Sequence, residues 1–237
     1  QDSIAGELER RLLKVASQLR QGSPLGGAVV DIGAMATPLQ VDIVEGLVAR
    51  AVEQGARVVI GGKRALAASG EYFAPTILAD VTPDMEIMQR ETFGPVMLLC
   101  SFVDDEQAIA IANGTAFALS SSVFSSNRKR ARAIADAVAA GMAAINDYGG
   151  MTYMAQDLTF GGVKQSGFGR LNGREGLRAM CNVKAVLDDR FGISMPTKLY
   201  PVSDNDFAVT SATLQLLYGR GLKRRLAGLG RLIASLF

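Results

Sequence analysis

The residues with the clearest chemical potential are Glu91 and Phe93, which stand two positions apart in the run Glu-Thr-Phe-Gly-Pro-Val. A carboxylate such as Glu91 can accept hydrogen bonds from both hydroxyls of a ribose, and the ring of Phe93 can lie against a flat heterocycle. Gly94 and Pro95 then predict a turn into an apolar strand over residues 96–103. Because α/β folds commonly bind ligands where a strand meets such a loop, this turn is a candidate binding site.

Three motifs, in the same order along the chain, carry a resemblance to the aldehyde dehydrogenase superfamily. Residues 91–96 resemble the (E)xFGP(V) signature of that family, and residues 160–170 (Phe-Gly-Gly-Val-Lys-Gln-Ser-Gly-Phe-Gly-Arg) resemble its FGGxKxSGxGR segment. Between them, residues 144–149 (Ala-Ile-Asn-Asp-Tyr-Gly) look like the short VN strand and loop of the family. The resemblance implies an α/β fold, namely part of an aldehyde dehydrogenase catalytic domain with parallel α/β crossovers.

The same resemblance implies ligand-binding roles for five residues. Glu91 would hold the nicotinamide ribose of NAD or NADP, and Phe93 would pack near the nicotinamide. Gln40 falls where relatives place a glutamine that helps to hold the cofactor ribose, although an exposed polar residue on a helix is an equal alternative. Phe160 and Met154 align with positions that line the aldehyde tunnel, and a methionine there would widen and soften an apolar channel.

No residue of this chain matches the catalytic nucleophile of the family. Relatives use a cysteine that attacks the aldehyde and forms a thioester, which water then hydrolyses. In the family pattern that cysteine, the general base and the dinucleotide-binding domain would lie upstream of Gln1. Cys100 and Cys181 are expected to pack as small hydrophobic residues. Leu171 stands where many relatives have a glutamate, so no proton-relay role is transferred and no catalytic residue is expected in this chain.

The leading hypothesis is therefore the C-terminal portion of an NAD(P)-dependent aldehyde dehydrogenase that oxidises an apolar aldehyde to its carboxylic acid and is inactive as an isolated fragment. Two alternatives stay open. One is an acylating or semialdehyde-specific member of the family, against which the apolar Met154 and Phe160 argue. The other is a non-catalytic assembly or membrane-docking module derived from the family.

Composition limits the class of protein. A content of 49% hydrophobic and 20% charged residues indicates a globular protein. Two distant cysteines do not make a disulfide framework, which favours a reducing, cytoplasmic compartment. The absence of histidine excludes His-based triads and most zinc sites, and no metal is expected. The basic run at residues 128–132 is interpreted as the solvated face of an amphipathic helix rather than a nucleic-acid site.

Hydrophobic periodicity and turn signals alternate along the chain, as in parallel α/β folds. Asp2 or Ser3 is expected to cap the first helix, and Thr37 to cap the second, which turns Leu39 inward together with Ile43, Leu47 and Val48. Helices are predicted over residues 4–19, 38–54, 104–113 and 127–140. Strands are predicted over residues 56–60, 75–81, 96–103, 122–124 and 142–146.

The C-terminal part is expected to form a separate element, so the predicted domains are residues 1–190 and residues 191–237. Residues 181–187 predict a strand, which in the family joins the oligomerisation sheet of a partner subunit and implies a homodimer or tetramer. The runs Tyr-Pro-Val at 200–202 and Leu-Leu-Tyr-Gly at 216–219 resemble a membrane-associated branch of the family from plants and fungi.

Charge and periodicity in this extension favour two kinds of surface. Residues 198–237 contain six basic and two acidic residues. A helical stripe of apolar residues runs through Leu222, Leu226, Leu229, Ile233 and Leu236. Residues 212–237 therefore predict either a helix on an anionic membrane surface, which would make the cytoplasmic protein membrane-associated, or a helix packed on its own or a neighbouring subunit.

Overall fold

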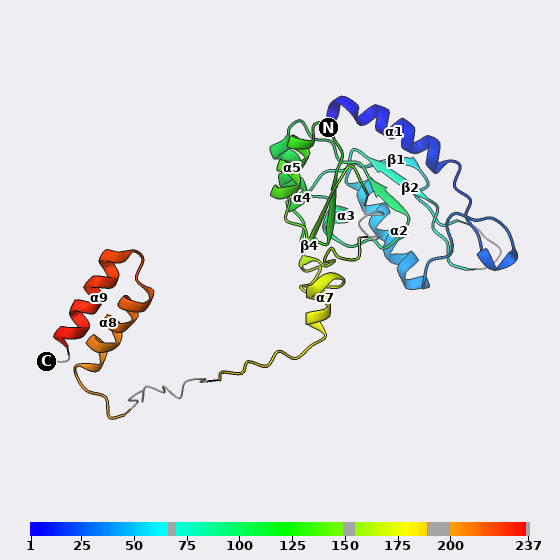
Figure 1. Cartoon of the computed structure of the whole chain (residues 1–237). Coiled ribbons are helices and arrows are strands. Elements are labelled where there is room, and N and C mark those ends of the chain that lie inside the picture. Colours follow the sequence, from blue (N-terminus) through cyan, green and yellow to red (C-terminus); the bar gives the residue numbers. More distant parts are fainter. Residues whose placement is uncertain (66–69, 149–154, 189–199, 236–237) are drawn as a thin grey trace. The chain divides into compact units, whose positions relative to one another are not determined.

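The computed structural model describes residues 1–65, 70–148, 155–188 and 200–235, whose path is drawn in Figure 1. By its internal contacts the chain divides into two units, Gln1–Asn182 and Val183–Phe237. Within the described ranges, the structure contains no helix that combines the length and the hydropathy needed to cross a membrane.

A three-stranded mixed sheet organises the N-terminal part of the first unit. Strand β2 (Thr76–Ala79) lies between β1 (Arg57–Ile60), to which it is antiparallel, and β3 (Val96–Leu98), to which it is parallel. All four residues of β2 are buried, as expected for a central strand. The three strands stand where the sequence predicts them but are shorter, and β2 ends where Asp80 turns the backbone to a φ of 59°.

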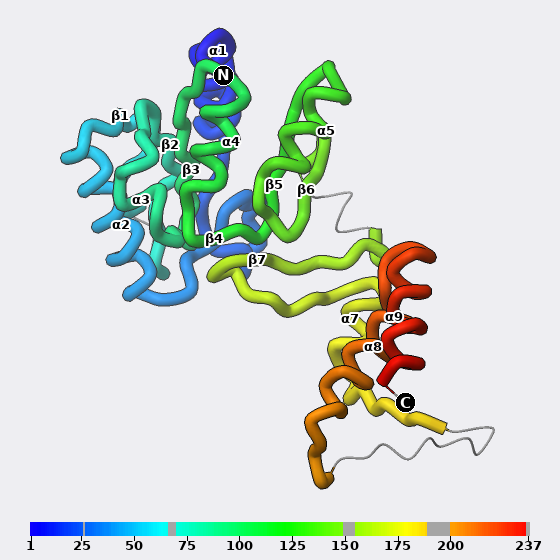
Figure 2. The backbone as a smooth tube through the Cα atoms, turned by 90° about the vertical axis from the view of Figure 1, so that its left-hand side faces the viewer, coloured from blue at the N-terminus to red at the C-terminus, as the bar shows by residue number. Residues whose placement is uncertain are grey.

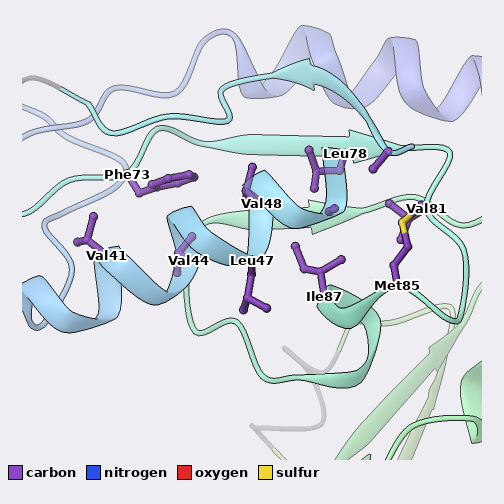
Figure 3. Close-up of a cluster of buried hydrophobic side chains, with 11 residues drawn as sticks. Val41, Val44, Leu47, Val48, Phe73, Leu78, Val81, Met85 and Ile87 are labelled. Atoms are coloured by element: carbon purple, nitrogen blue, oxygen red, sulfur yellow. The ribbon is translucent and has the colours of Figure 1, made fainter. Parts of the chain in front are cut away.

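Helix α2 (Pro38–Glu53) supplies most of the core beneath this sheet (Figure 3). The hydroxyl of Thr37 accepts the backbone N–H of Gln40 at 3.2 Å, which confirms the predicted cap, and Pro38 fits the first turn because its missing N–H has no role there. The buried residues of helix α2 are Val41, Val44, Leu47, Val48 and Ala51. The sheet and the following segment contribute Phe73, Leu78, Val81, Met85 and Ile87 to the same cluster.

The inward face of α2 differs from the prediction in the first turn. Leu39, expected to point inward, is 68% exposed, whereas Leu47 and Val48 are buried as predicted. Each residue rotates the helix by about 100°, so Leu39 lies roughly 200° from Val41, which is fully buried. The buried stripe therefore runs through Val41 and Val44 rather than through Leu39.

Helix α1 (Asp2–Ala16) contacts β1 and β2 but has no fully buried residue. Gln1 occupies its N-cap without a side-chain bond, so the predicted capping by Asp2 or Ser3 is wrong. Asp2 lies instead in the first turn, where a negative charge favours the helix dipole. Arg57 on β1 binds both Glu9 of α1 and Asp80, each at 2.9 Å, and so connects the helix to the sheet.

The rest of the first unit is built on two pairs of strands (Figure 2). Strand β5 (Ser120–Val123) is parallel to β6 (Met142–Ile145), and β4 (Phe117–Ala118) is antiparallel to β7 (Val163–Lys164). The parallel pair confirms the expected crossover, and α5 packs against both of its strands. The other elements are η1 (Pro24–Gly26), α3 (Glu86–Gln89), α4 (Asp105–Asn113), α5 (Arg128–Ala137) and α7 (Gly173–Ala179).

Two boundaries in this part differ from the prediction for physical reasons. Helix α5 was expected to reach residue 140, but it ends at Ala137, and Val138 is extended. The side chain of Asn113 donates to the carbonyl of Ala137 at 3.0 Å and accepts the N–H of Ala139 at 2.7 Å, replacing the bonds of a further helical turn. Strand β5 begins at Ser120, earlier than predicted, because it pairs with β6 from that residue on. The sequence did not indicate this start, since serine is not among the residues enriched in strands.

The second unit contains a hairpin of two helices, α8 (Asp206–Tyr218) and α9 (Leu222–Ala234), which lie side by side (Figure 1). Gly228 is buried at the crossing, where an added Cβ would lie 2.6 Å from the backbone nitrogen of Leu216 and 3.0 Å from the carbonyl oxygen of Ala212. The predicted stripe is present and exposed at Leu222, Leu226, Leu229 and Ile233, whereas Leu236 lies outside the described residues.

Residues 181–187 do not form the predicted strand within this chain. Their apolar side chains are solvent-exposed, and Leu187 is 101% exposed. A strand is stabilised by hydrogen bonds to a neighbouring strand, and none of the described residues of this chain forms a β-pair with residues 181–187. Because the expected neighbour belongs to another subunit, the oligomerisation strand stays a prediction.

Candidate functional site

The turn that carries Glu91 and Phe93 is held from behind by helix α2. The side-chain amide of Gln40 donates to the carbonyl of Thr92 at 2.7 Å. Gly94 lies so close to the helix that an added Cβ would stand 2.7 Å from a methyl group of Val44. Phe93 adopts a φ of 43°, a conformation uncommon outside glycine, and its side chain is 75% exposed. The turn therefore packs against helix α2, while the side chains of Glu91 and Phe93 are exposed to solvent.

Glu91 lines a cavity of about 410 Å³, which lies between the turn and strands β4 and β5. The carboxylate is exposed, so the pocket is open to a ligand on that side. Most of the lining is small and apolar, with hydroxyl groups from a few serine and threonine residues. The other lining residues are Ala112, Thr115, Phe117, Ala118, Leu119, Ser120, Ser121, Val138, Ala139, Ala140 and Ser166.

Phe160 lines a second cavity, of about 320 Å³, which shares Ser120 and Ser121 with the first. Strand β5 is thus the common wall of the two cavities, with Glu91 in one and Phe160 in the other. The remaining lining residues are Ser122, Met142, Ala144 and Tyr148. The structure therefore brings the predicted cofactor carboxylate and the predicted tunnel aromatic to neighbouring cavities.

Phe160 also lines a third and larger cavity, of about 880 Å³. This cavity is formed by the loop before Phe160 and by the start of α7, and it contains the cation Arg174 and the acid Asp157. Its other lining residues are Gln156, Leu171, Asn172, Gly173, Gly176 and Leu177. Phe160 is therefore common to the smaller and the larger cavity. Met154, the other predicted tunnel residue, lies outside the described residues.

The serines of β5 were missed from the sequence. Ser121 donates to the carbonyl of Met142 at 3.4 Å across the parallel pair, while Ser120 and Ser122 alternate with it along the strand. The only signal in the sequence is three consecutive serines between apolar residues, which does not by itself indicate a binding wall. The Tyr148 in the smaller cavity belongs to a motif that was recognised, but its place in the cavity was not predicted.

Neither cysteine lines a cavity that contains Glu91 or Phe160. Burial raises the pKa of the Cys100 thiol, which disfavours the reactive thiolate. Cys181 is exposed, and its thiol donates to the carbonyl of Leu177 at 3.5 Å. The described residues also contain no group of three or more His, Cys, Asp or Glu side chains placed to hold a metal ion.

Comparison with known proteins identifies the family. The profile of the aldehyde dehydrogenase family matches residues 1–186 of the 237. This chain belongs to the aldehyde dehydrogenase family. An aldehyde dehydrogenase-like protein of Schizosaccharomyces pombe is 43% identical over 187 residues, which cover 76% of this aldehyde dehydrogenase chain and 35% of that protein. The NAD(P)+ succinate semialdehyde dehydrogenase Sad of Escherichia coli is 36% identical over 192 residues, with 80% and 40% covered.

Solved structures agree with this assignment. The betaine aldehyde dehydrogenase of Staphylococcus aureus in complex with NAD+ superposes with a TM-score of 0.69 at 32% identity, over 75% of this aldehyde dehydrogenase chain and 35% of that one. The α/β fold expected from the sequence is therefore confirmed. The chain spans well under half of the length of these relatives, which are larger proteins.

Proposed function

We propose that this chain works within a longer enzyme that uses NAD or NADP to oxidise an apolar aldehyde to its carboxylic acid, through a thioester on a cysteine outside this chain. One observation carries the proposal: Glu91 and Phe160 line cavities that share the wall formed by Ser120 and Ser121. A ribose-binding carboxylate beside a substrate-lining aromatic is the arrangement that hydride transfer between bound cofactor and bound aldehyde requires.

The residues at the turn fit the ribose and ring of a nicotinamide cofactor. Glu91 offers an exposed carboxylate, whose two oxygens can accept hydrogen bonds from a pair of hydroxyls. Phe93 offers an exposed ring, and Gln40 fixes the peptide between them by its bond to Thr92. When bound, the nicotinamide group would supply the hydride acceptor. The part of this chain is to orient that group, with Gln40 acting through the turn.

The Glu91→Gln variant of the complete protein tests this assignment. A hydrogen bond to a charged group contributes about 1.5–3 kcal/mol, so turnover or cofactor affinity should fall by about tenfold or more. Glu53→Gln is the matched control, because Glu53 is an exposed acid at the end of α2 and lines none of the three cavities described above. Steady-state kinetics in both substrates would refute the assignment if Glu91→Gln and Glu53→Gln behaved alike.

A semialdehyde-specific or acylating enzyme is the second candidate. The similarity to the Escherichia coli succinate semialdehyde dehydrogenase favours it, and Arg174 in the 880 Å³ cavity could bind a substrate carboxylate. Rates of NAD(P)H formation with hexanal and with succinate semialdehyde, each with and without coenzyme A, separate these candidates. A complete protein inactive under every condition would instead support the non-catalytic assembly or docking module.

We further propose that the α8–α9 hairpin gives a cytoplasmic, oligomeric enzyme its contact with an anionic membrane surface. Helix α9 carries Lys223, Arg224, Arg225 and Arg231, contains no acidic residue, and leaves its leucine stripe exposed. Cations near an anionic surface each contribute up to about 1 kcal/mol, and salt screens this attraction.

Vesicle sedimentation at low and high salt tests the membrane contact. Because α8 begins at Asp206, the deletion should remove residues 203–237 rather than 212–237, so that no half-hairpin remains. The complete enzyme should sediment with phosphatidylserine vesicles at low salt, and the truncated enzyme should not. If truncation instead dissolves a dimer or tetramer without changing sedimentation, the stripe is a subunit interface.

A further inference from the structure

One guanidinium nitrogen of Arg170 contacts three backbone carbonyls in the loop that runs from Phe160 to Leu171. Its Nη1 lies 2.7 Å from the oxygen of Gly162, 2.9 Å from that of Gly169 and 3.1 Å from that of Phe168. Arg170 is half-buried, and Gly162 is buried. Because the donor is charged, these bonds are stronger than neutral ones. A single charged group thus holds together the two sides of the loop, one at Gly162 and the other at Phe168 and Gly169.

Gly161 gives the Arg170 side chain the space it needs. An added Cβ at Gly161 would overlap the carbonyl oxygen of Gly169 and lie 2.8 Å from Cδ of Arg170. On the neighbouring residue, Phe160 exchanges two backbone hydrogen bonds with Leu171, of 2.8 and 2.7 Å. The bridge and the guanidinium together close the loop with Phe160 at its base.

The far end of the same loop is attached by other groups. The ammonium of Lys164 donates to the carbonyls of Asn113 and Thr115, both at 2.9 Å, where α4 ends. The hydroxyl of Ser166 accepts the N–H of Ala118 at 2.9 Å. Loss of the Arg170 guanidinium would therefore leave the tip in place and loosen the base. The side chain at that base is Phe160, which is common to the 320 Å³ and 880 Å³ cavities.

We infer that Arg170 is a positioning residue that holds Phe160 between these two cavities and thereby sets the range of aldehyde lengths that the enzyme accepts. The inference rests on the proposed aldehyde oxidation. Arg170 acts through the backbone of the loop and does not need to touch substrate. Phe160 held at the wall that the two cavities share limits the space for the aldehyde chain, and Phe160 released from it admits longer chains and binds short ones less well.

The test is kcat/KM of the complete enzyme for straight-chain aldehydes from acetaldehyde to decanal. Arg170→Ala should reduce the discrimination between the best and worst chain lengths by about tenfold, the lower end of what one methylene group contributes in a hydrophobic pocket. The change should lie mainly in the KM for aldehyde, with the KM for cofactor unchanged. The discrimination of Arg170→Lys should lie between that of the unsubstituted enzyme and that of Arg170→Ala, because lysine keeps the positive charge but lacks the planar guanidinium group. Arg132→Ala, on the exposed face of α5, is the control.

Gly161→Ala provides a second variant if Arg170→Ala does not fold. It keeps the charge but fills the space that the Arg170 side chain crosses, and it should cause the same loss of discrimination. A uniform fall in kcat for every aldehyde, with unchanged ratios between them, would show a merely structural role and overturn the inference. Absence of activity in the unsubstituted enzyme with all aldehydes would overturn the proposed function itself, and with it the inference.

Discussion

Replacement of Gly141 by alanine should destabilise the first unit, although it adds one methyl group. The new Cβ would overlap the carbonyl oxygen of Gly161 and lie 2.6 Å from its carbonyl carbon and 2.8 Å from the Cα of Gly162. Ordinary contacts of this kind are 3.4–4 Å. All three atoms belong to the backbone, so no side chain can rotate away, and the loop that carries Phe160 must move from β6.

Two opposing terms set the size of the effect. Overpacking of this kind costs about 1–3 kcal/mol, while replacing glycine by alanine restricts the unfolded chain and stabilises by about 0.4–1 kcal/mol. The free energy of unfolding should therefore fall by about 1–2 kcal/mol. Urea unfolding of the 237-residue chain, followed by circular dichroism, measures this change.

Gly169→Ala is the matched control for this prediction. Gly169 lies in the same loop, yet an added Cβ there would meet no atom within 4 Å and its φ is ordinary. Its free energy of unfolding should stay within about 0.5 kcal/mol of the unsubstituted chain. Equal stabilities for Gly141→Ala and Gly169→Ala would show that the loop does not pack against Gly141, and the cavity geometry around Phe160 would then be wrong.

Two further predictions concern the α8–α9 hairpin and the loss of folding stability at low pH. Gly228→Val should force α8 and α9 apart and accelerate limited proteolysis within residues 206–235, whereas Gly230→Ala, whose Cβ meets open space, should slow proteolysis or leave it unchanged. The side chain and backbone N–H of Arg20 bind Asp31 and hold its pKa at about 2, below the usual 3.8. This depressed pKa stabilises the folded state above about pH 3.8, and the contribution is lost as pH falls towards 2. Urea midpoints measured against pH should lose that dependence in Asp31→Asn.

The sequence predicts best those features that are decided by neighbouring residues. The predicted cap of Thr37 is a local hydrogen bond to an N–H three residues on, and it is found. The end of α5 was wrong because Asn113, 24 residues away from Ala137, supplies the bonds that stop the helix. Leu39 was placed inside because periodicity defines a stripe but not which of two neighbouring stripes meets the sheet.

In the candidate site, too, features decided by neighbouring residues could be predicted and those decided by distant residues could not. Glu91 and Phe93 could be selected because their types and spacing stand in one short motif. The bond from Gln40 to Thr92 joins residues 52 positions apart, and the sequence indicated a role for Gln40 without its partner. Ser120 and Ser121 could not be selected, because their place beside Glu91 and Phe160 depends on the pairing of β5 with β6.

Close backbone packing explains how exposed groups can still be precisely oriented. Glu91 and Phe93 receive little support from their own side-chain surroundings, because both face solvent. Their orientation depends on the contact of Gly94 with Val44, as that of Phe160 depends on the approach of Gly141 to the neighbouring loop. At Gly141 the contact places two backbones directly against each other, and at Gly94 the backbone lies against the β-branched side chain of Val44, which has little rotamer freedom. Substitutions at these glycines should therefore alter ligand binding at residues they do not touch.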